Sequence, residues 1–125
     1  MVKLVNTRTG KTVIKNLSVR KTFLEKLTGY MMVPRPEADS GLLLLNTTRV
    51  HTLFMKFPLD LLYLDRSWKI IKTARNISGF RFPSPPSGCR HIVEVPHGGT
   101  ESRFDIKRGD RLSIVLKIPG KVPGE

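Results

Sequence analysis

The chain carries its densest apolar run at His51-Thr-Leu-Phe-Met-Lys-Phe-Pro-Leu-Asp-Leu-Leu-Tyr-Leu-Asp65. Successive side chains of a strand point to opposite faces, and from Leu59 to Asp65 both faces would be mainly apolar. This pattern predicts a central strand that is covered on both sides. Asp60 would then share a face with leucines. An ionised carboxylate needs hydrogen-bond donors in such a place, because desolvation disfavours its charge.

Pro58 divides this run, because proline cannot donate a hydrogen bond to a sheet ladder. If Phe57-Pro58 is a tight turn, the residues from His51 to Lys56 fold back as a neighbouring antiparallel strand. If it is only a kink, the run is one bent strand and His51 lies far from Asp60. The candidate donors to Asp60 are therefore His51, Lys56 and a backbone N–H of the turn.

The segments on either side of the run continue the β pattern. Val2 to Asn6 and Lys11 to Asn16 flank a turn that ends in Gly10, which is typical of a hairpin. Further strands are predicted at Leu42–Leu45, Trp68–Ala74, His91–Val95 and Arg111–Ile118. The chain is therefore expected to be rich in short strands.

One segment has helical spacing instead. Apolar residues recur every three or four positions between Val19 and Thr28, Ser18 can cap the start, and Gly29 ends the pattern. The predicted fold is accordingly α+β, mainly β: a largely antiparallel β-barrel or sandwich with one principal helix. Its length of 125 residues suits a single domain. We expect one β-rich domain over residues 1–118 and a flexible C-terminal tail over residues 119–125.

The formal net charge is +12, from 22 Lys and Arg against 10 Asp and Glu. Such a charge favours polyanions, so nucleic acid is a candidate partner. The basic residues are scattered from Lys3 to Lys121 without a block of five or six, which argues against a dedicated nucleic-acid-binding arm. The single cysteine excludes an internal disulfide. No apolar run approaches the roughly 20 residues of a membrane helix, and we expect a cytoplasmic protein.

Four segments together carry a resemblance to a known family. They are the run from His51 to Asp65, the glycine-led Gly41-Leu-Leu-Leu-Leu-Asn46, His91-Ile-Val-Glu-Val-Pro-His-Gly-Gly99 and Ile106-Lys-Arg-Gly-Asp-Arg-Leu112. Their order and spacing, from about Arg20 to Leu116, resemble the domain of unknown function family 192. The family's Gly-Leu-Met-like turn is matched only loosely by Leu27-Thr-Gly-Tyr-Met-Met32. The resemblance implies a compact, mostly β fold and no established activity.

Metal-ligating and nucleophilic residue types are present, but their spacing does not match a known site. Cys89, His91 and His97 could join His51 as metal ligands, yet no paired cysteine motif exists and Pro96 redirects the chain before His97. We therefore expect no metal and no cofactor. Cys89, His91 and Asp60 could be combined on paper as a nucleophilic triad, but no nucleophile elbow surrounds them.

A small non-enzymatic binding module is the leading functional prediction, with an unknown small ligand or protein as its partner. Its site would lie at one end of the barrel. The aromatic residues of the proline-rich loop before Gly88 would line the pocket mouth or fold back as lids on the core. The predicted ligand-binding residues are His51, Lys56, Asp60, Phe80, Phe82, Gly98 and Gly99.

Two alternatives of other classes stay open. The first is nonspecific nucleic-acid binding through a basic surface, which would weaken steeply with salt. The second is a small acid/base enzyme that uses Asp60 and His51. In each case we expect the Asp60 carboxylate to be buried and to accept a hydrogen bond.

Overall fold

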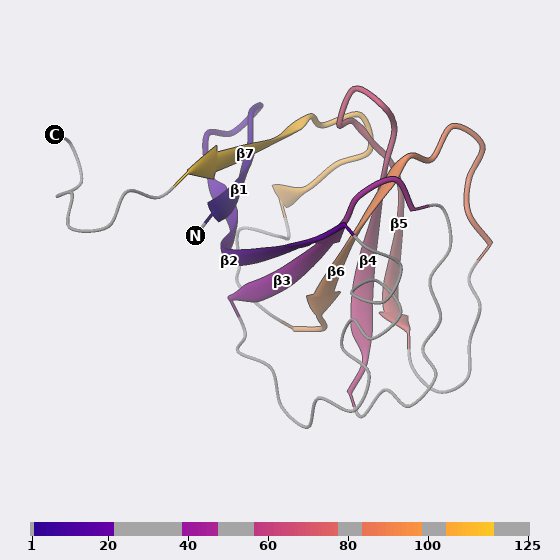
Figure 1. Cartoon of the computed structure of the whole chain (residues 1–125), viewed down its shortest axis with the longest axis horizontal. Coiled ribbons are helices and arrows are strands. Elements are labelled where there is room, and N and C mark those ends of the chain that lie inside the picture. The colour runs from indigo at the N-terminus through magenta and orange to yellow at the C-terminus, as the bar shows by residue number, and fades with distance from the viewer. Residues whose placement is uncertain (1, 22–38, 48–56, 78–83, 99–104, 117–125) are drawn as a thin grey trace, which may run out of the picture.

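The computed structural model describes residues 2–21, 39–47, 57–77, 84–98 and 105–116, and these form one seven-stranded β-sheet (Figure 1). The strands are β1 (Val2–Asn6), β2 (Thr12–Arg20), β3 (Ser40–Leu44), β4 (Leu59–Leu64), β5 (Ile70–Ile77), β6 (His91–Pro96) and β7 (Leu112–Leu116). Their order in the sheet is β5-β4-β6-β3-β2-β1-β7. The described residues contain no helix, and therefore none that could cross a membrane.

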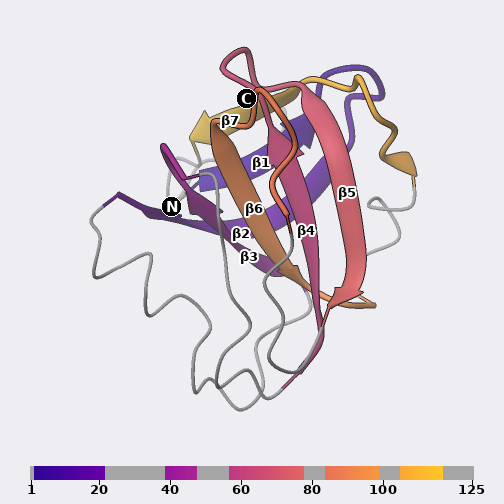
Figure 2. The ribbon, with the colours of Figure 1, turned by 90° about the vertical axis from the view of Figure 1, so that its right-hand side faces the viewer.

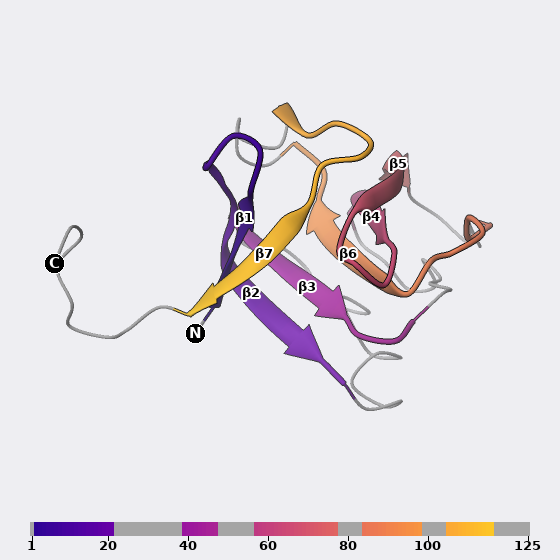
Figure 3. The same cartoon turned by 90° about the horizontal axis from the view of Figure 1, so that it is seen from above.

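The sheet is mixed and open. Five neighbouring strand pairs are antiparallel, whereas β2 and β3 run parallel. Within the described residues, an isolated bridge between Lys69 and Arg111 links the segments next to the edge strands β5 and β7. The prediction of a mainly β, largely antiparallel fold is confirmed, but the predicted barrel or sandwich is wrong, because one continuous sheet curls without a ladder between these edges (Figure 3).

The predicted helix from Val19 to Thr28 is wrong at its start. Val19 and Arg20 are the last residues of β2, and Ser18, the expected cap, pairs with Leu42 in the parallel ladder. Hydrogen bonds to a neighbouring strand outweigh the weak local preference that the helical spacing expresses. Residues 22–28 lie outside the described part of the chain.

The central-strand prediction is confirmed by β4. All six of its residues are buried, and it lies between β5 and β6. Leu62 and Leu64 belong to one hydrophobic cluster, while Leu59, Leu61 and Tyr63 belong to another. Both faces of this strand are therefore covered, as the apolar run indicated. The segment before Phe57 is outside the described residues, so the choice between a turn and a kink at Pro58 stays a prediction.

Two hydrophobic clusters lie on opposite faces of the sheet. The first, which we call the inner core, takes side chains from all seven strands, and the sheet curls around it (Figure 2). The second, the outer cluster, takes its buried residues from the central strands β3, β4 and β6, and partly buried side chains of β5 pack against it. The predicted hairpin of β1 and β2 closes against the inner core through Leu4 and Ile14, which are paired across the two strands.

Candidate functional site

A β-bulge in β5 lies beside Asp60. The pairing of β4 with β5 shifts by one residue at this place, so that Arg75 and Asn76 both fall opposite Asp60. Asn76 adopts a left-handed backbone with φ of 57°, a conformation that asparagine tolerates better than most residues. Bulges of this kind redirect side chains and are common next to binding sites. Here the bulge brings the Asn76 N–H to the Asp60 carboxylate and places Arg75 beside it in the strand, at the hollow described below.

Asp60 is buried, with 7% of its surface exposed. Its Oδ1 accepts a hydrogen bond from the Asn76 backbone N–H at 2.9 Å and lies 2.8 Å from Nδ1 of His97. The prediction of a buried, hydrogen-bonded Asp60 is confirmed, although its donors differ from those expected. Both of these contacts are made by Oδ1.

His97 follows directly after β6, and strand pairing determines its position. Val95 pairs with Asp60 across the β4–β6 ladder, so the residue just beyond Pro96 lies near the start of β4. The His97 N–H donates to the carbonyl of Pro58 at 3.0 Å, and Gly98 turns the chain with φ of 80°. A carboxylate can only accept, so Nδ1 is the donor when Asp60 is ionised, which turns Nε2 to the other side of the ring. The imidazole side chain is 40% exposed.

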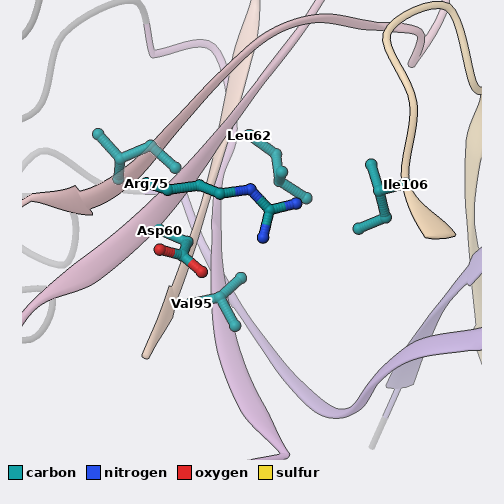
Figure 4. Close-up of a pocket in the computed structure, with 6 residues that line it drawn as sticks. Asp60, Leu62, Arg75, Val95 and Ile106 are labelled. Atoms are coloured by element: carbon teal, nitrogen blue, oxygen red, sulfur yellow. The ribbon is translucent and has the colours of Figure 1, made fainter. Parts of the chain in front are cut away.

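A small hollow opens next to Asp60 (Figure 4). Its floor is apolar, and the Arg75 side chain extends across it from the bulge towards Ile106. The residues that line it are Asp60, Leu61, Leu62, Arg75, Val95 and Ile106. The hollow thus combines one anionic group, one cationic group and a small hydrophobic surface.

Of the predicted ligand-binding residues, the structure describes Asp60 and Gly98. Gly98 lies in the turn directly after His97, so both predicted residues are at the same end of the sheet. The other five, His51, Lys56, Phe80, Phe82 and Gly99, lie outside the described residues. Arg75 was not among the predicted residues, because its place depends on a bulge that has no local signature. His97 was weighed as a metal ligand and otherwise expected at a strand end with ordinary hydrogen bonds, and the structure places it directly after β6.

Cys89 and His91 lie at the other end of the β4–β6 ladder, where His91 pairs with Leu64. The His91 ring stacks on Trp68 with 4.7 Å between centroids, and its Nδ1 accepts the N–H of Asn46 at 3.0 Å. The triad of Cys89, His91 and Asp60 is therefore not assembled. Within the part of the chain that the structure describes, no three His, Cys, Asp or Glu side chains gather as metal ligands.

A second buried carboxyl lies on the opposite face, in the outer cluster. Glu94 is paired with Leu42 on one side and Leu61 on the other, and only 5% of its surface is exposed. Burial raises the pKa of the Glu94 carboxyl from 4.5 to about 7, against the opposing effect of the Arg20 charge. The Tyr63 hydroxyl on the same face is also buried, and it has no hydrogen-bond partner among the described residues.

The fold and this arrangement define a class: a small, single-sheet β protein with a hollow at the end of its central strand. The chain belongs to the DUF192 family, described as "Uncharacterized ACR", whose model matches residues 4–114. The resemblance seen in the sequence is thus confirmed.

Three relatives illustrate the similarity. A UPF0127 protein of Thermococcus sibiricus is 28% identical over 99 residues, which are 76% of this chain and 64% of that protein. The chain therefore spans about two thirds of that relative's length. A crystal structure of a protein of unknown function from Novosphingobium aromaticivorans has a TM-score of 0.74 at 21% identity, over 90% of this chain and 82% of that one. A provisionally assigned transcription regulator from Sinorhizobium meliloti has a TM-score of 0.63 at 21% identity, over 90% of each chain. These two structures share the fold.

Proposed function

We propose that this protein is a small non-enzymatic binding module whose ligand occupies the hollow beside Asp60 and Arg75. The observation that carries the proposal is the bulge, which places Arg75 and a buried carboxylate, Asp60, on the lining of one hollow. A few polar groups that converge on an apolar hollow are typical of ligand sites. The Asn76 N–H and His97 hold Asp60 in place before any ligand arrives, which reduces the entropy lost on binding.

The chemistry of the hollow limits the ligand. The Asp60 carboxylate can accept a hydrogen bond from a hydroxyl or an amine, and a guanidinium such as that of Arg75 can donate to a carboxylate or carbonyl oxygen. Leu62, Val95 and Ile106 supply apolar contact surface beside these groups. Small hydroxy acids and amino acids combine these three features, so they are the ligand class that we propose.

The test is a titration of the ¹⁵N-labelled protein with a panel of small hydroxy and amino acids, followed by NMR. Binding in the hollow should shift the amide signals of Asn76, His97 and Ile106. Losing one charge-assisted hydrogen bond costs about 1.5–3 kcal/mol, so Arg75→Gln should weaken binding roughly 10- to 150-fold. Arg90→Gln removes an exposed arginine at the other end of β6 and is the matched control.

Two outcomes would contradict the proposal. One is that no member of the panel shifts any of these three amides at millimolar concentration. The other is that Arg75→Gln and Arg90→Gln bind a shifted ligand equally well. Asp60→Asn provides an independent check, because it retains the size of the side chain but replaces a carboxylate oxygen with a donor. It should impair binding of ligands that donate to the Asp60 carboxylate.

Acid–base catalysis is the second candidate, and the contact of Asp60 with His97 favours it. The sequence suggested Asp60 with His51, which lies outside the described residues. With Nδ1 held by the carboxylate, Nε2 of His97 could accept a proton from a water or a substrate bound beside the imidazole. Chromogenic ester hydrolysis that disappears in His97→Gln and persists in Arg90→Gln would support this activity. Equal rates in the two variants would exclude His97 as the base.

A further inference from the structure

Two turns that are distant in the sequence meet at the end of the sheet opposite Asp60. They are the turn between β4 and β5 and the turn before β7, and both lie at the top of the views in Figures 1 and 2. The Ile70 N–H donates to the carbonyl of Asp110 at 2.8 Å, and the Leu112 N–H donates to the carbonyl of Trp68 at 3.0 Å. These backbone hydrogen bonds hold the two turns together as one rigid surface.

This surface collects five exposed cationic side chains, which we call the basic corner: Arg66, Lys69, Lys107, Arg108 and Arg111. Lys69 and Arg111 face each other in the isolated bridge between the edge strands. Directly opposed residues of an antiparallel pair have Cβ atoms only about 5 Å apart, so two positive charges are held side by side. Like charges in such a position repel each other, and an anion that binds both would relieve that repulsion.

The nearby carboxylates are already committed to other groups. Oδ1 of Asp65 accepts the N–H groups of its own turn. Asp110 is buried against Arg8, and Asp105 pairs with Lys11. None of the five cations of the basic corner forms an ion pair with another described residue. Lys69 and Lys107 still interact through space with the charges of Asp65 and Asp105, but all five side chains are exposed to solvent.

We propose that the basic corner is a nucleic-acid interface that contacts the phosphate backbone. Several rigidly held cations from neighbouring turns match the repeated charges of a polynucleotide, and the net charge of +12 adds long-range attraction. An anionic membrane is a poorer match. Within the described part of the chain, the exposed large apolar side chains are Ile114, Val115 and Leu116, and none of them lies on these turns. The corner contributes no helix for reading bases, so binding is expected to show little sequence preference.

The test is fluorescence anisotropy with a labelled 20-base-pair duplex between 50 and 200 mM salt. If all five cations contact phosphates, log K falls with log salt with a slope of about −4.5, which is a loss of about 500-fold over this range. The double variant Lys69→Gln/Arg111→Gln should reduce the magnitude of that slope by about 2. Lys3→Gln/Lys15→Gln removes the same charge from β1 and β2 and should leave the slope nearly unchanged. Circular dichroism checks that both variants are folded.

Three results would overturn this inference. The first is an absence of duplex binding by the wild-type protein at 50 mM salt. The second is an equal effect of the two double variants, which would show that net charge alone is responsible. The third is tighter binding to phosphatidylserine vesicles than to the duplex, which would assign the corner to a membrane surface. Arg75→Gln should leave duplex binding intact, so this inference and the small-ligand proposal can fail separately.

Discussion

Replacing Glu94 with glutamine should stabilise the protein at alkaline pH and change it little in acid. Burial raises the pKa of this carboxyl from 4.5 to about 7, and one pKa unit corresponds to about 1.4 kcal/mol. The folded state thus holds its proton more tightly than the unfolded state does. The resulting stabilisation is fully present below pH 4.5 and is lost as the pH rises through 7. Between pH 5 and pH 8 the wild-type protein should lose about 2–3 kcal/mol through this group.

Glutamine does not titrate, so the variant should not show that loss. The measurement is urea unfolding followed by far-UV circular dichroism at pH 5, 6, 7 and 8, with the free energy of unfolding extrapolated to water. Asp105→Asn is the control. This exposed carboxylate, which pairs with Lys11, has a lowered pKa, so its contribution to stability is constant at neutral pH and is lost only in acid. The profile of the variant should therefore run parallel to that of the wild type above pH 5. Parallel profiles for the wild type and Glu94→Gln would refute the reasoning.

Three further substitutions test the packing, each by urea unfolding. Asp110→Ala should cost about 2–4 kcal/mol, because a buried amide and a backbone N–H lose their acceptor. Equal stability would show that water replaces the carboxylate. Tyr63→Phe should be neutral or stabilising, since the buried hydroxyl that it removes has no partner among the described residues. A clear loss of stability would show that the hydroxyl has a hydrogen-bond partner. Gly41→Ala should cost about 1–3 kcal/mol, because its new Cβ would lie 2.6 Å from Cδ1 of Ile14. An unchanged midpoint would mean that Ile14 moves aside freely.

The elements that the sequence predicted well are those with a strong local pattern. The apolar run gave β4 its central place, and the turn around Gly10 gave the hairpin of β1 and β2. Burial of Asp60 also followed from the pattern, because its neighbours on one face are leucines. The helix failed at Val19 because helical spacing is only a weak preference, and the parallel ladder to β3 satisfied the backbone instead.

The candidate site depended on contacts that no local pattern encodes. Arg75 lines the same hollow as Asp60 at the place where one extra residue bulges out of β5, and His97 contacts Asp60 because β6 runs antiparallel to β4. The basic residues seemed scattered for the same reason. Lys69 and Arg111 are 42 positions apart in the sequence, yet they are neighbours in the isolated bridge. Charge clustering in a sheet depends on strand order, which cannot be deduced from spacing along the chain.

The pairing of β1 with β7 has a consequence for biosynthesis. Val2 pairs with Leu116, and ribosomes add about 5–20 residues per second, so β1 waits roughly 5 to 25 s for this partner. During that time the emerging chain can form the β1–β2 hairpin, but the outer edge of β1 remains unpaired. Unpaired strand edges promote association between chains. A nascent chain of this protein is therefore most prone to aggregate before β7 leaves the ribosome, and a holdase that covers β1 would raise its yield.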